Sequence, residues 1–451
     1  MTRGAIVALV LALAAVSGAP PALQSAEVPG DFLRYHRAGR LVATGRAAGL
    51  YDTELLAAQQ VYAAERADER TRHGDAADPY QEHEFKYAPA MAVLMAPLGT
   101  LHPRTANVLW SVWNALLLAG LVLAAWRLAF ADDVHGVWLV PPLVVLARTL
   151  NDNHNLGQLN PSAIVPAVLG LVLLARRRDV AAGALVAWGA VVKYMPAFLL
   201  PWLVWKRAWR ALAAMVVGVL LLFWALPAAV LGPGAATALT QEWIDVRSHH
   251  YTAARAPDLP GHSIKSFVYR VFGETPWITG RGANRVELDV SVVHLPPEVL
   301  RWGTWALGLG VLVVVLRACG RRLRDGGPHG AAIEHGLVLA ALLLVSPEAR
   351  TPHFLYALLL AFGVVAALVR AHRDASFPRG RLRAALTLTV VWALLQNLDS
   401  TKLGTLGHHS DALCAMGWGT AALMGAGALL LPRGGAGASR RPHRASEGPR
   451  P

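Results

Sequence analysis

The sequence has few charged residues and almost no cysteine. Charged side chains make up 16% of its 451 residues and hydrophobic ones 55%, with a mean hydropathy of +0.39. Soluble globular domains carry about 25% charged residues, so this composition argues against a water-soluble enzyme. The two cysteines, Cys319 and Cys414, cannot form a disulfide framework, and neither lies in a C-x-x-C pair. The composition therefore predicts an all-α polytopic membrane protein.

Sequence signatures of several common sites are absent as well. There is no H-E-x-x-H zinc motif, no G-x-x-x-x-G-K-[ST] phosphate loop, no G-x-S-x-G nucleophile elbow and no D-x-D pair to hold a metal on a nucleotide-sugar pyrophosphate. The adjacent pairs His249–His250 and His408–His409 have the wrong spacing for two ligands on one helical face. We therefore expect neither a metal ion nor a cofactor.

Long apolar runs recur along the chain. A transmembrane helix needs about 20 mostly apolar residues, and this criterion predicts a bundle of about 12 transmembrane helices. The runs lie near 4–21, 105–126, 134–150, 160–175, 179–193, 195–206, 211–231, 299–317, 331–346, 353–370, 383–397 and 411–432. Residues 91–101 are also apolar but too short to cross, and we expect an interfacial or re-entrant segment there.

The distribution of charge predicts the orientation. If the N-terminus is cytoplasmic, the short inner connectors hold about half of the 42 Lys and Arg residues, as cytoplasmic loops do. The transmembrane unit is then 1–432, with long outer loops at 22–104 and 232–298 and a basic, disordered cytoplasmic tail at 433–451. The net charge is +13, and we expect the basic tail to bind anionic membrane lipid and the chain to have no nucleic-acid partner. A cleavable signal peptide remains an alternative for 4–21.

Polar residues gather at the outer ends of the predicted spans. They occur in DFLRYHRA with GLYD, in FKYAPA, NDNHNLGQLNPS, KYMP and SPEARTPHFLY, and in the long loop at HHY and GHSIKSFVYR. Transport pathways place ionisable groups near the middle of the membrane, and few candidates lie there. Crowding of polar residues at one face favours chemistry on a substrate that is presented at that face.

Each cluster also has a purely structural interpretation. Asp31 follows Pro-Gly and suits a helix N-cap, and Lys193 suits a cation that snorkels to the interface. Gln158 and Asn160 are placed to cap the span at 160–175, and His353 suits an interfacial histidine. The functional interpretation depends on all of these residues occurring together on one face.

These motifs resemble, in order, the bacterial membrane glycosyltransferases of family 87. The resemblance lies in DF followed by LYD, in F-x-Y-x-P, in GQLNP, in K-x-x-P, in HSIKSFVYR and in SPEARTPHFLY, and it spans about 31–370. The chain departs from the family pattern at Ala88, where many relatives have proline, and at His262, where glutamine or asparagine is common. The resemblance implies a GT-C fold in the bacterial inner membrane with the active site on the outer, periplasmic side.

The resemblance also implies an activity and a set of residue roles. Such enzymes transfer a hexose, typically mannose, from a polyprenyl-phosphate sugar donor to a lipid-linked or glycan acceptor. Asp31 would be the general base on the acceptor hydroxyl, and His353 would lie near the donor phosphate with Lys193. Further substrate-binding candidates are Gln158, Asn160, Tyr87, Lys265, Arg270 and Arg350.

Other functional classes remain possible at this stage. A transporter or flippase of lipid-linked sugars is the main alternative, and it would need polar residues at mid-span depth. A non-catalytic assembly factor would tolerate the loss of Asp31, whereas a phosphoryl or acyl transferase would act on other substrates. The sequence leaves the sugar, the acceptor, the linkage and the oligomeric state open.

Overall fold

A computed structural model describes residues 28, 30–51, 85–130, 134–250, 261–279, 286–320, 327–347, 349–398 and 403–431. The first predicted span (4–21), Asp52 of the GLYD motif and the basic tail (433–451) lie outside the described residues.

The described chain is almost entirely helical. Its N-terminal half comprises α2 (Gly30–Ala43), η1 (Ala47–Gly49), α6 (Pro89–Gly99), α7 (Pro103–Ala129), η3 (Gly136–Leu139), α8 (Val140–Val145), α9 (Ala147–Asn155), α10 (Asn160–Ala175), α11 (Asp179–Val192), η4 (Met195–Phe198), α12 (Leu199–Trp205), α13 (Trp209–Leu220), η5 (Leu221–Ala225), α14 (Leu226–Leu231) and α15 (Pro233–His250).

The C-terminal half adds the remaining helices and one small sheet. Its elements are α16 (Ile264–Val271), β1 (Trp277–Thr279), β2 (Val286–Leu288), α17 (Pro297–Cys319), α18 (Gly327–Val345), η7 (Thr351–Ala357), α19 (Leu358–Arg373), α20 (Arg379–Asn397), α22 (Thr405–Ala412) and α23 (Ala415–Leu430). The two strands pair antiparallel with Trp277 opposite Leu288. The composition did not predict this hairpin, which lies within the second long loop.

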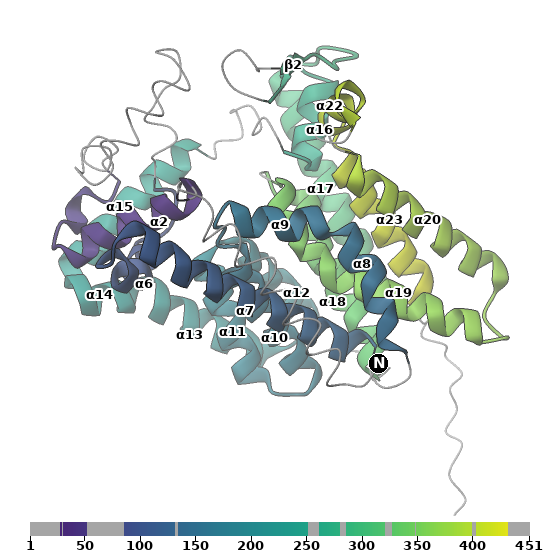
Figure 1. Ribbon diagram of the computed structural model, residues 1–451, viewed down its shortest axis with the longest axis horizontal. Helices are drawn as coiled ribbons and strands as arrows, with labels where there is room; N and C mark the ends of the chain where they lie inside the picture. The colour runs from purple at the N-terminus through teal and green to yellow at the C-terminus, as the bar shows by residue number, and fades with distance from the viewer. Residues whose placement is uncertain are drawn as a thin grey trace, which may run out of the picture.

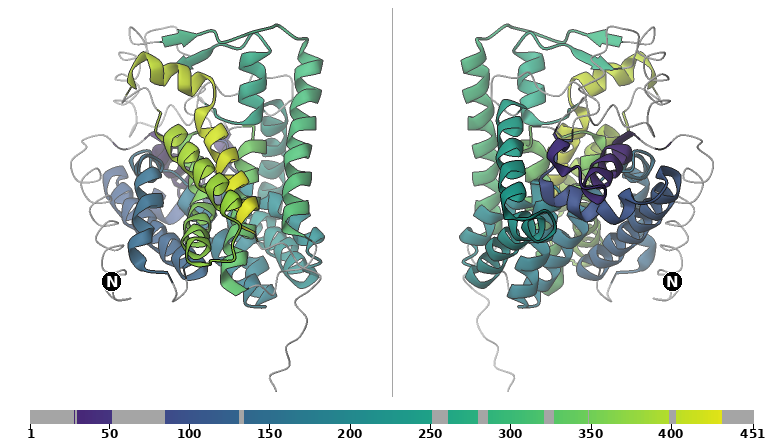
Figure 2. Two further views of the ribbon diagram at one scale, coloured as in Figure 1. Left: turned by 90° about the vertical axis from the view of Figure 1, so that its right-hand side faces the viewer. Right: turned by 90° about the vertical axis from the view of Figure 1, so that its left-hand side faces the viewer.

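The helices form three packed groups (Figure 1). Helices α2, α6, α14 and α15 pack together at one end, α7, α10, α11 and α13 form a middle layer, and α17 to α20 pack with α23 at the other end. Figure 2 shows the hairpin, α16 and α22 together above the helical bundle. Of the four long apolar helices in the described part of the chain, the one formed by η7 and α19 is the most deeply buried, with 78% of its most apolar window inside the protein.

The all-α membrane architecture is confirmed, but twelve spans are not. In the described part of the chain, four helices are long and apolar enough to cross a membrane alone: Pro103–Ala129, Trp209–Leu231, Pro297–Cys319 and Thr351–Arg373. A fifth span results if α22 and α23, which meet at a 62° bend, are counted as one. The other apolar runs form shorter helices. At 1.5 Å per residue, the 16-residue α10 extends only about 24 Å against a hydrocarbon core of about 30 Å.

Small residues allow the short middle helices to pack closely. A Cβ atom at Gly183 of α11 would collide with the Ala211 carbonyl oxygen of α13, and one at Gly189 would collide with the Ala163 carbonyl oxygen of α10. Membrane helices use small residues in this way because lipid supplies little hydrophobic force to drive them together. The result is a tightly packed support beneath the polar residues at the ends of α10 and α11.

Basic residues of the predicted inner connectors hold the C-terminal carbonyls of other helices. Arg370 donates to Ala129 O and Phe130 O at the end of α7, at 2.9 and 3.1 Å. Lys206 donates to Cys319 O and Gly320 O at the end of α17, each at 3.0 Å, and forms an ion pair with buried Glu334. Because helix C-termini leave carbonyls unpaired, these cations stabilise the ends of the two helices.

Candidate active site

Asp31 lies in the first turn of α2, a helix that is fixed tightly to α6. A Cβ atom at Gly39 would collide with the Met95 carbonyl oxygen, and one at Gly99 would collide with the backbone of Arg40. Phe32 and Tyr35 are buried on the same helix. The Asp31 side chain itself remains 25% exposed. The chain therefore holds this carboxylate on a rigid element while leaving it accessible.

Two donors engage the Asp31 carboxylate, one on each oxygen. The Arg34 guanidinium lies 3.1 Å from Oδ1, and the Gln158 side-chain amide donates to Oδ2. Gln158 was predicted to bind substrate or to cap a helix, whereas in the structure it contacts the predicted base directly. A carboxylate offers about four lone-pair positions, so these two contacts leave capacity for a further donor.

Aromatic side chains join Tyr87 to the helix that carries Asp31. The Tyr35 and Tyr87 hydroxyls lie 3.2 Å apart, and Tyr51 donates to the Tyr87 carbonyl oxygen at 2.9 Å. Burial raises the pKa of Tyr35 well above its usual value, with smaller contributions from Tyr87 and Asp31, so its hydroxyl stays protonated. The F-x-Y-x-P segment therefore contacts the helix that carries Asp31, as expected if both belong to one site.

A second polar cluster joins the ends of α10, α11 and η7. Lys193 Nζ donates to Asn160 Oδ1 at 2.7 Å and lies 2.7 Å from His353 Nε2. The backbone N–H of Arg350 donates to His353 Nδ1 at 2.9 Å. All three side chains of the cluster, Lys193, Asn160 and His353, are buried. The structure thus brings together three residues that the sequence places 33 and 160 positions apart.

One turn connects the two clusters. The GQLNP segment links α9 to α10 and carries Gln158, which contacts Asp31, and Asn160, which contacts Lys193. Gly157 has a φ of +62°, a conformation that glycine adopts readily. Trp110 Nε1 donates to Gly157 O at 2.9 Å and Asn114 Nδ2 donates to Gln158 O at 3.1 Å, so α7 fixes the turn. A proton acceptor and a cation are therefore positioned by the same five residues.

Asn153 is a member of this network that the sequence analysis did not select. It is fully buried, accepts from Asn160 Nδ2 at 3.0 Å and donates to Thr149 O at 2.8 Å and to Pro352 O at 2.7 Å. The sequence analysis noted the polar run NDNHN, but the sequence gives no reason to prefer one polar residue of this run over another. Asn153 is distinguished only by the burial of its side-chain amide in the folded protein. It links α9 to the segment that carries His353.

Two of the three remaining predicted residues lie away from both clusters. Arg270 is fully buried, and its guanidinium donates to the carbonyls of Asp411 and Ala412 at 3.4 and 3.3 Å, where α22 ends. Lys265 lies over the Tyr269 ring on α16, 5.5 Å from its centroid. The Arg350 residue is exposed and reaches His353 through its backbone. Of these three, the structure places only Arg350 in contact with the His353 cluster.

His262 lies beside the joint between α22 and α23. Its backbone N–H donates to Ala349 O at 2.7 Å, and its ring packs edge-on against Phe354. Burial, and then the nearby Arg270 and Arg148, lower the pKa of His262 to about 3, so the imidazole is neutral at physiological pH. This residue secures the segment that leads to His353.

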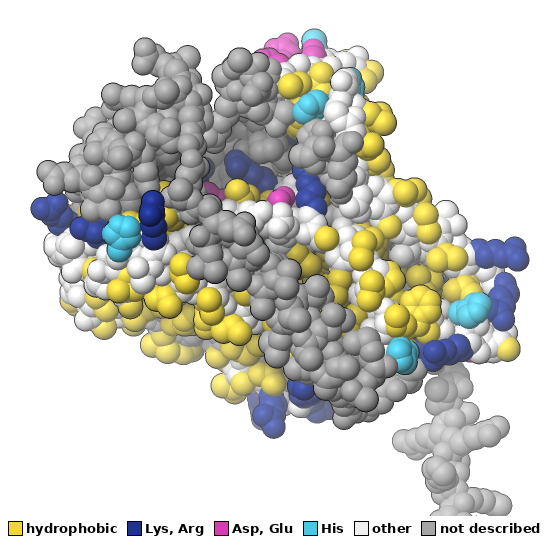
Figure 3. Space-filling view, in the orientation of Figure 1, with side chains coloured by type: hydrophobic (Ala, Val, Ile, Leu, Met, Phe, Trp, Pro, Cys, Tyr) yellow, Lys and Arg dark blue, Asp and Glu magenta, His cyan; other side chains and the backbone are white. Residues whose placement is uncertain are grey.

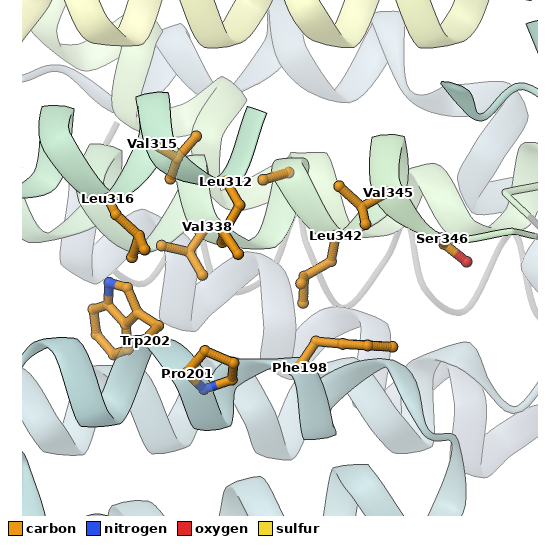
Figure 4. A pocket seen from close by; sticks show the side chains of 11 residues that line it. Phe198, Pro201, Trp202, Leu312, Val315, Leu316, Val338, Leu342, Val345 and Ser346 are labelled. Atoms are coloured by element: carbon orange, nitrogen blue, oxygen red, sulfur yellow. The ribbon is translucent and has the colours of Figure 1, made fainter. Parts of the chain in front are cut away.

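An apolar cavity of about 80 Å³ lies between α12, α17 and α18 (Figure 4). Phe198, Trp202, Leu316 and Leu342 are among its lining residues, and Ser346 lies at one end. Two of its lining residues are close in sequence to the second cluster: Phe198 follows Lys193 by five residues, and Ser346 precedes His353 by seven. On the molecular surface, charged side chains gather in a hollow and hydrophobic ones cover the flank below it (Figure 3).

Comparison with known proteins identifies the family. The model of glycosyltransferase family 87 matches residues 85–347, which is more than half of the chain. The chain belongs to glycosyltransferase family 87. The match includes Gln158, Asn160 and Lys193, whereas Asp31 lies 54 residues before its start and His353 lies six residues after its end.

Membership of family 87 makes this membrane protein a glycosyltransferase. The curated proteins and the solved structures that were compared with the chain gave no match. In the described part of the chain, no group of three or more His, Cys, Asp or Glu side chains is arranged to hold a metal ion.

Proposed function

We propose that this family 87 glycosyltransferase transfers a hexose, with mannose the first choice, from a polyprenyl-phosphate sugar to a lipid-linked or glycan acceptor. Asp31 is the general base and the Lys193–His353 cluster binds the donor phosphate. The observation that carries the proposal is the GQLNP turn, which contacts the carboxylate through Gln158 and the cationic cluster through Asn160. A base and a phosphate site on one rigid turn suit a transfer between two bound substrates.

The reaction needs few groups. The acceptor oxygen bonds to the anomeric carbon while the bond from that carbon to the phosphate oxygen breaks, and the hydroxyl proton passes to Asp31. General base catalysis of this kind contributes about 10²–10⁴-fold to the rate. Arg34 and Gln158 hold the carboxylate in place during the transfer. The departing phosphate takes up negative charge, which the Lys193 ammonium stabilises.

The hydrogen-bonding state of His353 supports phosphate binding. Its Nδ1 accepts the Arg350 N–H, so a neutral imidazole carries its proton on Nε2. The 2.7 Å contact between Nε2 and Lys193 Nζ is a hydrogen bond, so one of these two nitrogens accepts in the structure. An anion that enters between them would separate the two nitrogens and accept an N–H from each, and the lysine is then an ammonium that favours an anionic ligand over a neutral one.

Two further observations support a lipid donor presented at the outer face. The apolar cavity of about 80 Å³ is lined by residues from Phe198 to Ser346, and these two residues are close in sequence to Lys193 and His353. The capping cations Lys206 and Arg370 lie at the C-terminal ends of α12 and α19, and these two helices begin a few residues after Lys193 and His353. Their placement is consistent with an inner face there and an outer, periplasmic site in a bacterial inner membrane.

The test is transfer by the purified protein in lipid nanodiscs. Radiolabelled polyprenyl-phosphate mannose should donate its sugar to a lipid extract, and Lys193→Met should abolish most of that transfer. Consumption of a nucleotide sugar instead of the lipid-linked donor would contradict the proposal. Movement of the lipid-linked sugar across the bilayer without transfer would indicate a flippase.

A further inference from the structure

A second apolar cavity lies on the Asp31 side of the GQLNP turn. Its volume is about 330 Å³, and α6, α7, α10 and α11 form its walls. The lining includes Met91, Met95, Leu109, Trp110, Trp113 and Trp188. Methionine and tryptophan side chains adapt to flexible apolar ligands and offer large contact areas. Nothing in the proposed catalytic mechanism uses this cavity.

The indole N–H groups of Trp110 and Trp113 in its walls already have partners. Trp110 Nε1 donates to Gly157 O at 2.9 Å, and Trp113 Nε1 donates to Ser162 Oγ at 3.1 Å. A sugar placed in this cavity would leave its hydroxyls without comparable hydrogen bonds, at a cost of about 1–3 kcal/mol for each unpaired group. The cavity is therefore chemically suited to hydrocarbon and not to a glycan.

Its position relates it directly to Asp31. Trp110 forms part of the wall, and its ring lies 6.0 Å from Phe32 and 6.3 Å from Tyr35 on the helix that carries Asp31. Leu109 and Trp113, in the first three turns of α7, are 49% and 47% exposed and lie on the face that would meet lipid. A hydrocarbon chain that enters past these two residues would lie against Trp110, the part of the wall that packs on the helix carrying Asp31.

We propose that this cavity binds the hydrocarbon chain of a lipid-linked acceptor, so that the acceptor hydroxyl is presented to Asp31 from the membrane. The inference rests on the proposed function, because it takes Asp31 as the base for the acceptor. It decides between the two acceptor classes that the sequence left open. An apolar cavity of about 150 Å³ holds benzene, so 330 Å³ accommodates about a dozen chain carbons.

The first experiment varies the chain of a simple acceptor. The purified protein receives polyprenyl-phosphate mannose together with methyl, octyl or dodecyl mannoside, and KM is measured for each glycoside. Each buried methylene group contributes up to about fourfold in affinity. We expect the octyl glycoside to have a KM at least about tenfold below that of the methyl glycoside, with little further gain beyond about twelve carbons.

Two variants on the lipid-facing side of α7 provide a matched comparison. Leu109→Trp narrows the opening of the cavity, whereas Leu116, which is 57% exposed two turns further along, does not line it. We expect Leu109→Trp to raise the KM for octyl mannoside about tenfold and to leave that for methyl mannoside within twofold. Leu116→Trp should behave like the parent. Equal KM values for methyl and octyl mannoside, with transfer intact, would overturn the proposal and leave the proposed function standing.

A second experiment does not depend on turnover. An octyl mannoside with a diazirine at its chain end is photolysed in the nanodisc-bound protein, and the labelled peptides are mapped. We expect label on 91–98 and 109–113, displaced by dodecyl mannoside but not by excess diacyl phospholipid. Equal displacement by phospholipid, or labelling no stronger than at exposed Trp302 and Trp305 of α17, would mean bulk lipid only and would overturn the proposal. If this label appears but no glycoside accepts sugar and no donor is consumed, the proposed function fails while the cavity remains a lipid site.

Discussion

Two buried lysines have different expected roles: one belongs to the proposed phosphate site, and the other forms a structural ion pair. Lys193 contacts Asn160 and His353 near the start of α10 and the end of α11, whereas Lys206 contacts Glu334 and the carbonyls at the end of α17. Both side chains are at least nine-tenths buried. Substitution of each by methionine keeps the length of the side chain and removes the charge, so the pair gives a controlled test of the phosphate assignment.

For Lys193→Met, we expect a functional loss with a small change in stability. A charge-assisted hydrogen bond to the donor phosphate contributes about 1.5–3 kcal/mol, which corresponds to about 10–150-fold in donor KM or kcat/KM. Loss of the hydrogen bond to Asn160 costs about 1 kcal/mol of stability, and removal of a buried charge offsets part of that cost. The assay is donor-dependent transfer in nanodiscs, with the melting temperature measured in parallel.

For Lys206→Met, we expect the opposite result. The variant removes the ammonium that faces the buried Glu334 carboxylate, and breaking a buried ion pair from one side costs about 3–5 kcal/mol of stability. The molecules that remain folded should bind the donor normally. Unchanged donor KM in Lys193→Met, or equal loss of donor affinity in both variants, would refute the assignment of Lys193 to the phosphate.

Three further predictions follow from the site and the topology. Gln158→Leu removes the amide that positions Asp31, and kcat should fall about tenfold or more with little change in donor KM; a changed KM with an unchanged kcat would return Gln158 to substrate binding. Burial lowers the pKa of His262 to about 3, so below pH 6.5 the unfolded chain binds more protons than the folded chain and the free energy of unfolding decreases. The parent should therefore lose about 2 kcal/mol more stability between pH 7 and pH 5 than His262→Gln does. Chemical denaturation at both pH values measures this difference. An impermeant thiol reagent added outside should label a cysteine substituted at exposed Val292 but not one substituted at exposed Ser376. The native cysteines are buried and should give little background labelling. The reverse labelling pattern would invert the predicted topology.

The sequence predicted the helical membrane character but not the number of crossings. Hydropathy reports that α10 and α11 are apolar, yet it does not distinguish a helix that faces lipid from one that faces other helices. In the structure, Gly183 and Gly189 bring these short helices against their neighbours, and most of their surface meets protein. A span count from apolar length alone therefore exceeds the four or five helices of sufficient length in the described residues.

The predicted site residues were chosen one motif at a time, and their contacts depend on tertiary structure. Asp31 and Gln158 are 127 positions apart, and no local pattern indicates that one amide would contact the predicted base. Arg270 shows the opposite limitation. Its motif suggested a role in binding, but the break between α22 and α23 leaves carbonyls that this buried guanidinium satisfies. That break is not evident from hydropathy, which predicted one continuous span at 411–432.

The most direct test of the account is transfer by Asp31→Asn. Asparagine keeps the size of the side chain and caps helices about as well as aspartate, but it cannot accept the acceptor proton. We predict a rate loss of about 10²–10⁴-fold, roughly 3–5 kcal/mol in the barrier, with an unchanged melting temperature. Asp152→Asn, a nearby carboxylate that is 31% exposed and pairs with Arg148 at 4.0 Å, serves as the matched control and should retain most activity. Transfer by Asp31→Asn within tenfold of the parent rate would contradict the assignment of Asp31 as the base.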